Sequence, residues 1–104
     1  MKFDFKNPLD APMIFDYWAS RLNLVFNNQM RFNVYTGPGG DYILWMTSDA
    51  CPMPGDYTYC RYKKFEKREE LEQQIDSLLR DEKFRYKFYK DFIDDYHRII
   101  IEEL

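Results

Sequence analysis

The sequence predicts an α+β fold, in which a small antiparallel β-sheet of three to four strands carries two C-terminal helices packed on one face, with a short N-terminal helix. Two observations lead to this prediction. All 4 glycines and all 5 prolines of the 104 residues lie between Pro8 and Gly55, so turn signals are confined to the first half of the chain. Beyond Gly55 no glycine or proline follows, and from residue 67 the apolar residues recur at helical spacing, which favours long uninterrupted helices.

The N-terminal segment is predicted to contain one short helix. In residues 1–11, Phe3 and Phe5 alternate with charged residues, a pattern compatible with a short edge strand. A helix is predicted over residues 12–20, because proline is tolerated at the first helical position and the large apolar residues that follow share one face. This segment therefore contributes a helix and at most one further strand.

Residues 21–27 fit two structures. Leu22, Leu24 and Phe26 alternate with other residues ahead of an asparagine-rich turn, which indicates a hairpin strand. The competing interpretation extends the first helix, because large residues also recur at helical spacing, namely Phe15, Trp18, Leu22 and Phe26. The sequence alone leaves both interpretations open.

Three segments are predicted as the strands of the sheet. Residues 30–36 alternate in polarity, and the turn at 37–41 is so short that they must pair antiparallel with the next strand at 42–47. That second strand is almost entirely apolar, so we expect it to be buried on both faces. Residues 49–56 are predicted as a loop, and residues 57–65 as a third strand that is basic toward its end.

Two helices complete the predicted fold, one from residue 67 to 80 and one from residue 82 to 102. In each, the apolar residues follow one helical face, which is typical of a helix packed on a core. The residues of the two stripes are Leu71, Ile75, Leu78 and Leu79 in the first helix, and Phe84, Phe88, Phe92, Tyr96 and Ile99 in the second.

Length and composition narrow the class of protein. A chain of 104 residues, 45% of them hydrophobic, predicts one domain spanning residues 1–104. The net charge of −3, from 15 basic and 18 acidic residues, argues against a binder that relies on electrostatics alone. The sequence shows no secretory leader and no apolar run of membrane-spanning length, so we expect a soluble cytoplasmic protein without membrane attachment.

No constellation of residues indicates catalysis, a metal or a cofactor. Cys51, Cys60 and His97 are too few for a four-ligand zinc site, and the cysteines are expected to be free thiols. The glycine-rich turn at 37–40 opens a strand and lacks the lysine of a phosphate-binding loop. We therefore expect a non-enzymatic protein with no catalytic residues, no metal and no cofactor.

The tyrosine- and lysine-rich third strand is the first candidate binding surface. Tyrosine and arginine are enriched in protein interfaces, because they bury a large area and keep a polar group. We predict that a protein partner is bound by Tyr57, Tyr59, Arg61, Tyr62, Lys63 and Lys64. Lysines at this position are equally typical of a strand edge protected against aggregation.

The last helix carries a second cluster, in which basic and aromatic residues alternate. Its composition is typical of nucleic-acid binding, with Lys83, Tyr86, Lys87 and Lys90 as the contact residues. On a helix, however, the phenylalanines of this stretch turn inward, and Asp91 dilutes the basic charge that phosphate binding requires.

The sequence therefore predicts a small inhibitor- or adaptor-like interaction protein that docks a protein partner. Inhibitors encoded by phages or mobile elements often have this size. Nucleic-acid binding is the alternative prediction, and the oligomeric state is left undetermined.

Overall fold

The computed structural model describes residues 10–55 and 57–103, which form three helices and three strands. Their order is α1 Asp10–Val25, β1 Arg31–Thr36, β2 Tyr42–Met53, β3 Tyr57–Phe65, α2 Arg68–Arg80 and α3 Glu82–Glu103. The predicted α+β class is confirmed. The edge strand considered around Phe3 and Phe5 lies outside the described residues.

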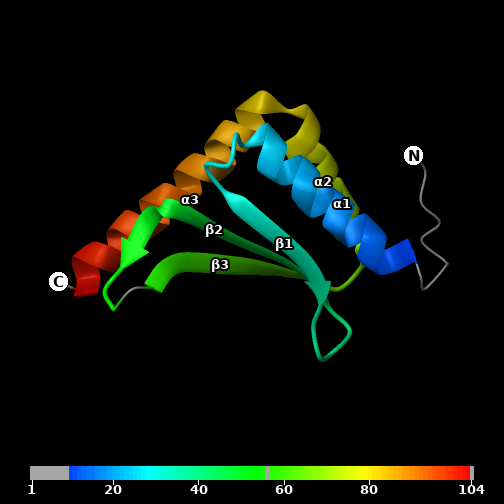
Figure 1. The fold of residues 1–104 in the computed structure, drawn as a ribbon, viewed down its shortest axis with the longest axis horizontal. Coiled ribbons are helices and arrows are strands. Elements are labelled where there is room, and N and C mark those ends of the chain that lie inside the picture. The colour runs from blue at the N-terminus through cyan, green and yellow to red at the C-terminus, as the bar shows by residue number, and fades with distance from the viewer. Residues whose placement is uncertain (1–9, 56, 104) are drawn as a thin grey trace.

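The strands form one antiparallel sheet in the order β1-β2-β3, and the helices lie together on one side of it (Figure 1). The layer between helices and sheet holds the core, which includes Leu22, Phe26, Phe32, Val34, Leu44, Met46, Leu71, Ile75, Leu78 and Phe92. The prediction that both C-terminal helices cover one face is confirmed, and α1 covers the same face. Within the described residues no helix lies against the opposite face.

α1 continues to Val25, so the helical interpretation of residues 21–25 is confirmed and the hairpin interpretation is wrong. Helical spacing decides the outcome, because it buries Phe15, Trp18, Leu22 and Phe26 together. Leu24, which the hairpin would have placed beside them, is 64% exposed. Asn27 and Asn28 adopt φ angles of 53° and 60° and donate their N–H groups to carbonyl oxygens of the last helical turns. The asparagines thus end the helix rather than form a hairpin turn.

β1 and β2 form the predicted hairpin. Its turn is closed by the N–H of Gly37, which donates to the carbonyl oxygen of Asp41 at 2.8 Å. Gly40 has a φ of +83°, a conformation that strains any residue with a side chain. The glycine-rich segment is therefore a hairpin turn, as its place ahead of an apolar strand indicates.

β2 is longer than the sequence predicts, because the strand continues through residues 49–53. The prediction of a loop over residues 49–56 is therefore wrong for most of its length. Pro52 and Pro54 resemble turn residues in the sequence. Pro52 is nevertheless tolerated in the strand, because it lies at an irregularity in the pairing with β3.

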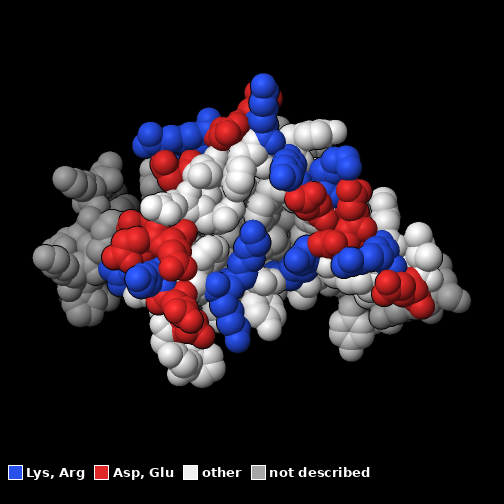
Figure 2. Space-filling view, turned by 180° about the vertical axis from the view of Figure 1, so that it is seen from behind, with Lys and Arg blue, Asp and Glu red and all other residues white. Residues whose placement is uncertain are grey.

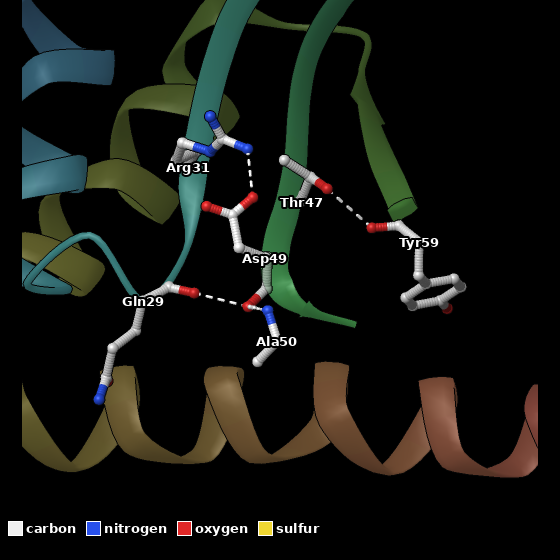
Figure 3. A network of polar contacts seen from close by, with 7 residues as sticks. Gln29, Arg31, Thr47, Asp49, Ala50 and Tyr59 are labelled. Carbon is white, nitrogen blue, oxygen red and sulfur yellow. Dashed lines mark hydrogen bonds and ion pairs between the residues drawn. The ribbon is translucent and has the colours of Figure 1, made fainter. Parts of the chain in front are cut away.

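The irregularity is a β-bulge that sets the register of β3. Residues 48–51 of β2 stand opposite the single residue Tyr59. The Ser48 hydroxyl donates to the carbonyl oxygen of Gln29 at 2.6 Å, and the Thr47 hydroxyl donates to that of Tyr59 at 2.8 Å (Figure 3). A change of register by one residue would exchange the two faces of β3, so these contacts decide which of its side chains meet the core.

α2 and α3 begin and end within one residue of their predicted limits, and their apolar stripes face the core as expected. Only Asp81 separates them. Its carboxylate accepts hydrogen bonds from the N–H groups of Lys83 and Phe84 at 3.0 and 3.2 Å and caps α3. Arg85 Nη1 donates to two carbonyl oxygens in the last turn of α2, at 2.9 and 3.0 Å. Side chains thus satisfy free backbone groups at the C-terminal end of α2 and at the N-terminal end of α3.

Replacing Asp81 by alanine is expected to lower the free energy of unfolding by about 1 kcal/mol, because the first N–H groups of α3 lose their acceptor. Asp81→Asn retains an acceptor oxygen and should lose less. Urea unfolding of both variants measures the difference. Equal stability of wild type and Asp81→Ala would show that this cap contributes nothing.

Candidate functional site

The strand predicted as the partner-binding surface presents its residues on two different faces. Side chains alternate along a strand, and cross-strand partners lie on the same face of the sheet. Arg61 stands opposite Met46, a core residue, whereas Tyr62 stands opposite Trp45. The odd-numbered residues from Tyr59 onward therefore face the helices, and the even-numbered residues face away from them.

Tyr59 is a core residue rather than a surface residue. Only 9% of it is exposed, and its ring centroid lies 5.0 Å from that of Phe92 and 5.7 Å from that of Tyr96. The bulge turns Tyr59 toward α3, and the sequence contains no local sign of that bulge. The sequence predicts Tyr59 as a partner contact, but its side chain is buried in the core and is not available at the surface. Tyr57, two residues earlier, is 74% exposed.

The folded protein is expected to lose stability as the pH rises above about 9, because the fold disfavours ionisation of two buried side chains, Cys51 and Tyr59. Burial raises the pKa of the Cys51 thiol above its ordinary value of 9.0, and burial raises the pKa of the Tyr59 hydroxyl above 10.0. Both groups are neutral in the fold and ionise more readily in the unfolded chain, so alkaline pH favours unfolding. Chemical unfolding between pH 8 and 11 tests this. Cys51→Ala and Tyr59→Phe should each flatten the decline, and an unchanged slope in both would contradict the assignment.

The side chains of Arg61 and Lys63 contact α3. Arg61 forms an ion pair with Asp95, and the Lys63 ammonium lies 5.3 Å from the ring centroid of Phe88. Both side chains remain exposed, but each is already engaged with the helix. They form one wall of a groove between β3 and α3, rather than a free basic patch.

This β3–α3 groove has a volume of about 300 Å³. Its apolar lining comes from Met46, Phe88 and Phe92, and Tyr62 of the edge strand also borders it. The carboxylates along α3 are those of Asp91, Asp94 and Asp95. The charges of the two walls largely compensate each other. The groove therefore suits an apolar side chain better than a strongly charged ligand.

Tyr62 and Lys64 lie on the opposite side of the sheet, together with residues of β1 and β2. We call this surface the open sheet face and define it by Asn33, Tyr35, Ile43, Trp45, Tyr62 and Lys64. Tyr62 is 58% exposed and Tyr35 is 39% exposed. On the central strand, Trp45 is half-buried between its neighbours, and Ile43, at 7% exposed, is buried. The surface is a shallow row of aromatic side chains backed by paired strands.

Trp45 and Tyr35 are the surface residues that the sequence interpretation missed. Residues 42–47 are expected to be buried on both faces, and on the open sheet face Ile43 and Thr47 are indeed buried, at 7% and 4% exposed. Trp45 between them is only partly buried. The short turn at 37–41 indicates which residues of β1 and β2 pair across the hairpin. The sequence does not indicate the register of β3, which places Tyr62 beside Trp45.

One end of the open sheet face carries compensated charge. Arg31 forms an ion pair with Asp49, and both side chains are exposed beside the bulge (Figure 3). Lys64 lies at the other end, its ammonium 5.9 Å from the ring centroid of Tyr62. Among the described residues none of the ion pairs involves Lys64. Its charge is therefore available to a carboxylate from outside.

The second predicted cluster lies on the exposed side of α3. Lys83, Tyr86 and Lys87 are exposed, with Tyr86 at 69%. Lys90 donates to Asp94 at 3.0 Å, and this hydrogen bond raises the pKa of Lys90. Figure 2 shows basic and acidic side chains intermingled over the face it displays. Such a distribution gives little net attraction for a phosphate backbone.

The described residues contain no group of three or more His, Cys, Asp or Glu side chains placed to hold a metal ion. Cys51 is buried and Cys60 is exposed, and both are free thiols. No described helix combines the length and the apolar character that crossing a bilayer requires. Comparison with protein families, curated proteins and solved structures finds no match to this chain.

Proposed function

We propose that this chain is a non-enzymatic, inhibitor- or adaptor-like domain that binds a protein partner through the open sheet face. The observation that carries the proposal is the row of aromatic side chains on a sheet face that no described helix covers. Tryptophan and tyrosine are enriched in protein-binding hot spots. Exposed apolar surface of this kind commonly marks an interaction site.

The rigidity of the surface supports the same function. Trp45 lies on the central strand, and on the opposite face of the same strand Leu44 and Met46 are packed in the core. The aromatic side chains therefore lose little conformational freedom when a partner covers them. The partner surface that fits is apolar at its centre and offers a carboxylate to Lys64, which has no ion pair among the described residues.

The proposed surface differs from the one predicted from the sequence. Tyr62 and Lys64 belong to it, Tyr59 does not, and Arg61 and Lys63 flank it on the far side of the β3 edge. The partner is expected to contact Trp45 and Tyr35 as well. The nucleic-acid alternative, through Lys83, Tyr86, Lys87 and Lys90, is less well supported, because acidic residues neighbour that cluster.

Affinity capture with matched tyrosine variants tests the proposal. The tagged chain, Tyr62→Asp and Tyr86→Asp are each incubated with nuclease-treated cell extract. Both tyrosines are well exposed, at 58% and 69%, so neither substitution should disturb the core. A protein retained by wild type and Tyr86→Asp, and reduced about tenfold or more with Tyr62→Asp, is the expected result.

Two outcomes would contradict the proposal. Retention that is equal for Tyr62→Asp and wild type would remove the open sheet face from consideration. Salt-sensitive binding of single- or double-stranded oligonucleotides, lost in Lys83→Glu with Lys87→Glu, would establish the nucleic-acid alternative instead.

A further inference from the structure

The two edges of the sheet differ in how they are covered. At β1, the backbone N–H of Phe32 donates to Asn23 Oδ1 of α1 at 2.8 Å, so the helix reaches this edge. At β3, residues 60–64 are all exposed, and no described strand pairs beyond them. Within the described part of the chain, β3 is therefore an uncovered edge strand.

The hydrogen bond of Phe32 also indicates which backbone groups point outward at β3. In a strand, the N–H and C=O groups of successive residues point to opposite edges. Because the N–H of Phe32 points away from β2, the odd-numbered residues of β1 bond to β2. Their partners on β2 are residues 43, 45 and 47, so residues 44 and 46 of β2 point their backbone groups toward β3. Residues 44 and 46 pair with residues 63 and 61, which therefore bond to β2, and the backbone groups directed outward belong to Cys60, Tyr62 and Lys64.

Different chemistry flanks this edge on its two sides. On the helix side lies the β3–α3 groove, with its apolar lining and balanced charges. On the open sheet face, Lys64 projects beside Tyr62 without an ion pair among the described residues. An added strand would place alternate residues on these two sides. Apolar residues fit the groove side, and acidic residues fit the side of Lys64.

We propose that β3 receives an extended segment of the partner protein as a fourth strand, with alternating apolar and acidic residues. The proposal rests on the proposed function for the existence of a partner, and it adds the mode of binding and the class of segment. The outward N–H and C=O groups of Cys60, Tyr62 and Lys64 supply the main-chain hydrogen bonds. The groove and Lys64 select the side chains.

A second copy of this chain fits the edge less well. Two β3 strands paired antiparallel about Arg61, Tyr62 or Lys63 would place Arg61 or Lys63 opposite a like charge of the other copy. Like charges directly opposite each other are destabilising in a sheet. This repulsion disfavours a second copy. Lys64, on the other side of the strand, favours an acidic segment, so charge points to a different molecule as the occupant.

The probe is a capped nine-residue peptide of alternating Glu and Val, added to the full, isotope-labelled chain. Without peptide, the amide hydrogens of Cys60, Tyr62 and Lys64 should exchange rapidly, and those of residues 61 and 63 slowly. With saturating peptide, the three fast amides should slow about tenfold or more. An alternating Lys and Val peptide should bind more weakly, and a peptide N-methylated at alternate residues should not protect them.

Tyr62→Pro and Tyr62→Ala separate main-chain pairing from side-chain contact. Both remove the ring, but only proline removes the outward N–H. Proline is tolerated on an edge strand where that N–H faces solvent, so both variants should fold, as circular dichroism would verify. Tyr62→Pro is expected to bind the peptide about five- to tenfold more weakly than Tyr62→Ala. Lys64→Pro against Lys64→Ala repeats the comparison at a second position.

The outcomes separate the two proposals. Absence of peptide-induced protection, or equal affinity of each proline and alanine pair, would overturn edge pairing and leave Tyr62-dependent capture of a partner intact. Protection of the same three amides without peptide, increasing with protein concentration, would show that a second copy occupies the edge and would also overturn this inference. Edge protection by the acidic peptide combined with a proline-specific loss of affinity establishes it.

Discussion

Replacing Phe92 by alanine is expected to lower the free energy of unfolding by about 3–5 kcal/mol, the largest effect expected of any single change here. Phe92 is 2% exposed, and its ring packs against that of Tyr59 between α3 and the sheet. Removing it leaves a cavity that rigid neighbours cannot fill completely. The loss is a large part of the stability of a typical domain, so the melting temperature should fall by more than about 10 °C.

Tyr86→Ala is the matched control for this prediction. Tyr86 lies on the same helix but is 69% exposed, so its removal should change the free energy of unfolding by less than about 0.5 kcal/mol. Urea and thermal unfolding of both variants give the comparison. A loss below about 1 kcal/mol for Phe92→Ala would mean that α3 is not seated on the sheet through this residue.

Replacing Trp45 by alanine is expected to weaken binding of the protein partner by about 30- to 100-fold, or roughly 2–3 kcal/mol. Trp45 lies on the central strand, with Asn33 on one side and Tyr62 on the other, so it is at the middle of the open sheet face. Tryptophan at the centre of an interface combines a large buried area with few rotatable bonds. Trp45→Phe should retain part of the affinity.

Titration of the captured partner with each variant measures this effect, and thermal unfolding checks that the sheet is retained. A Trp18→Phe variant keeps Trp45 as the one remaining tryptophan, since the chain has 2. Trp18 is buried in the core and lies apart from the open sheet face, so this variant should bind normally. Its fluorescence should shift to shorter wavelength when the partner covers Trp45. Undiminished binding by Trp45→Ala would contradict the proposed surface.

Local pattern was sufficient for most of the elements. The stripe of Leu71, Ile75 and Leu78 predicted α2 to within one residue, because each turn of a surface helix must direct its apolar residues to one side. Residues 21–27 were ambiguous, since Leu22 and Phe26 satisfy both a period of two and a helical period. Burial of Phe15 and Trp18 with them resolved the ambiguity, and that burial depends on tertiary packing.

The candidate surface was only partly predictable. The residue types of β3 predict an interface, which stays a proposal, and of the predicted residues Tyr62 and Lys64 lie on the open sheet face. Tyr59 does not, because residues 48–51 bulge opposite it and turn it to the core. A bulge is stabilised by contacts from distant residues, here the carbonyl of Gln29, and the nearby composition does not reveal it.

By itself, the sequence determined the class of fold, the order of helices after strands and the hairpin turn, because periodicity and turn chemistry act over a few residues. Only the tertiary structure decided which side of β3 meets the helices and which residues meet solvent beside Trp45. The physical reason is the period of two in a strand. A shift of one residue in the register of β3 exchanges its buried face for its exposed face, and that register is set by contacts with residues distant in the sequence.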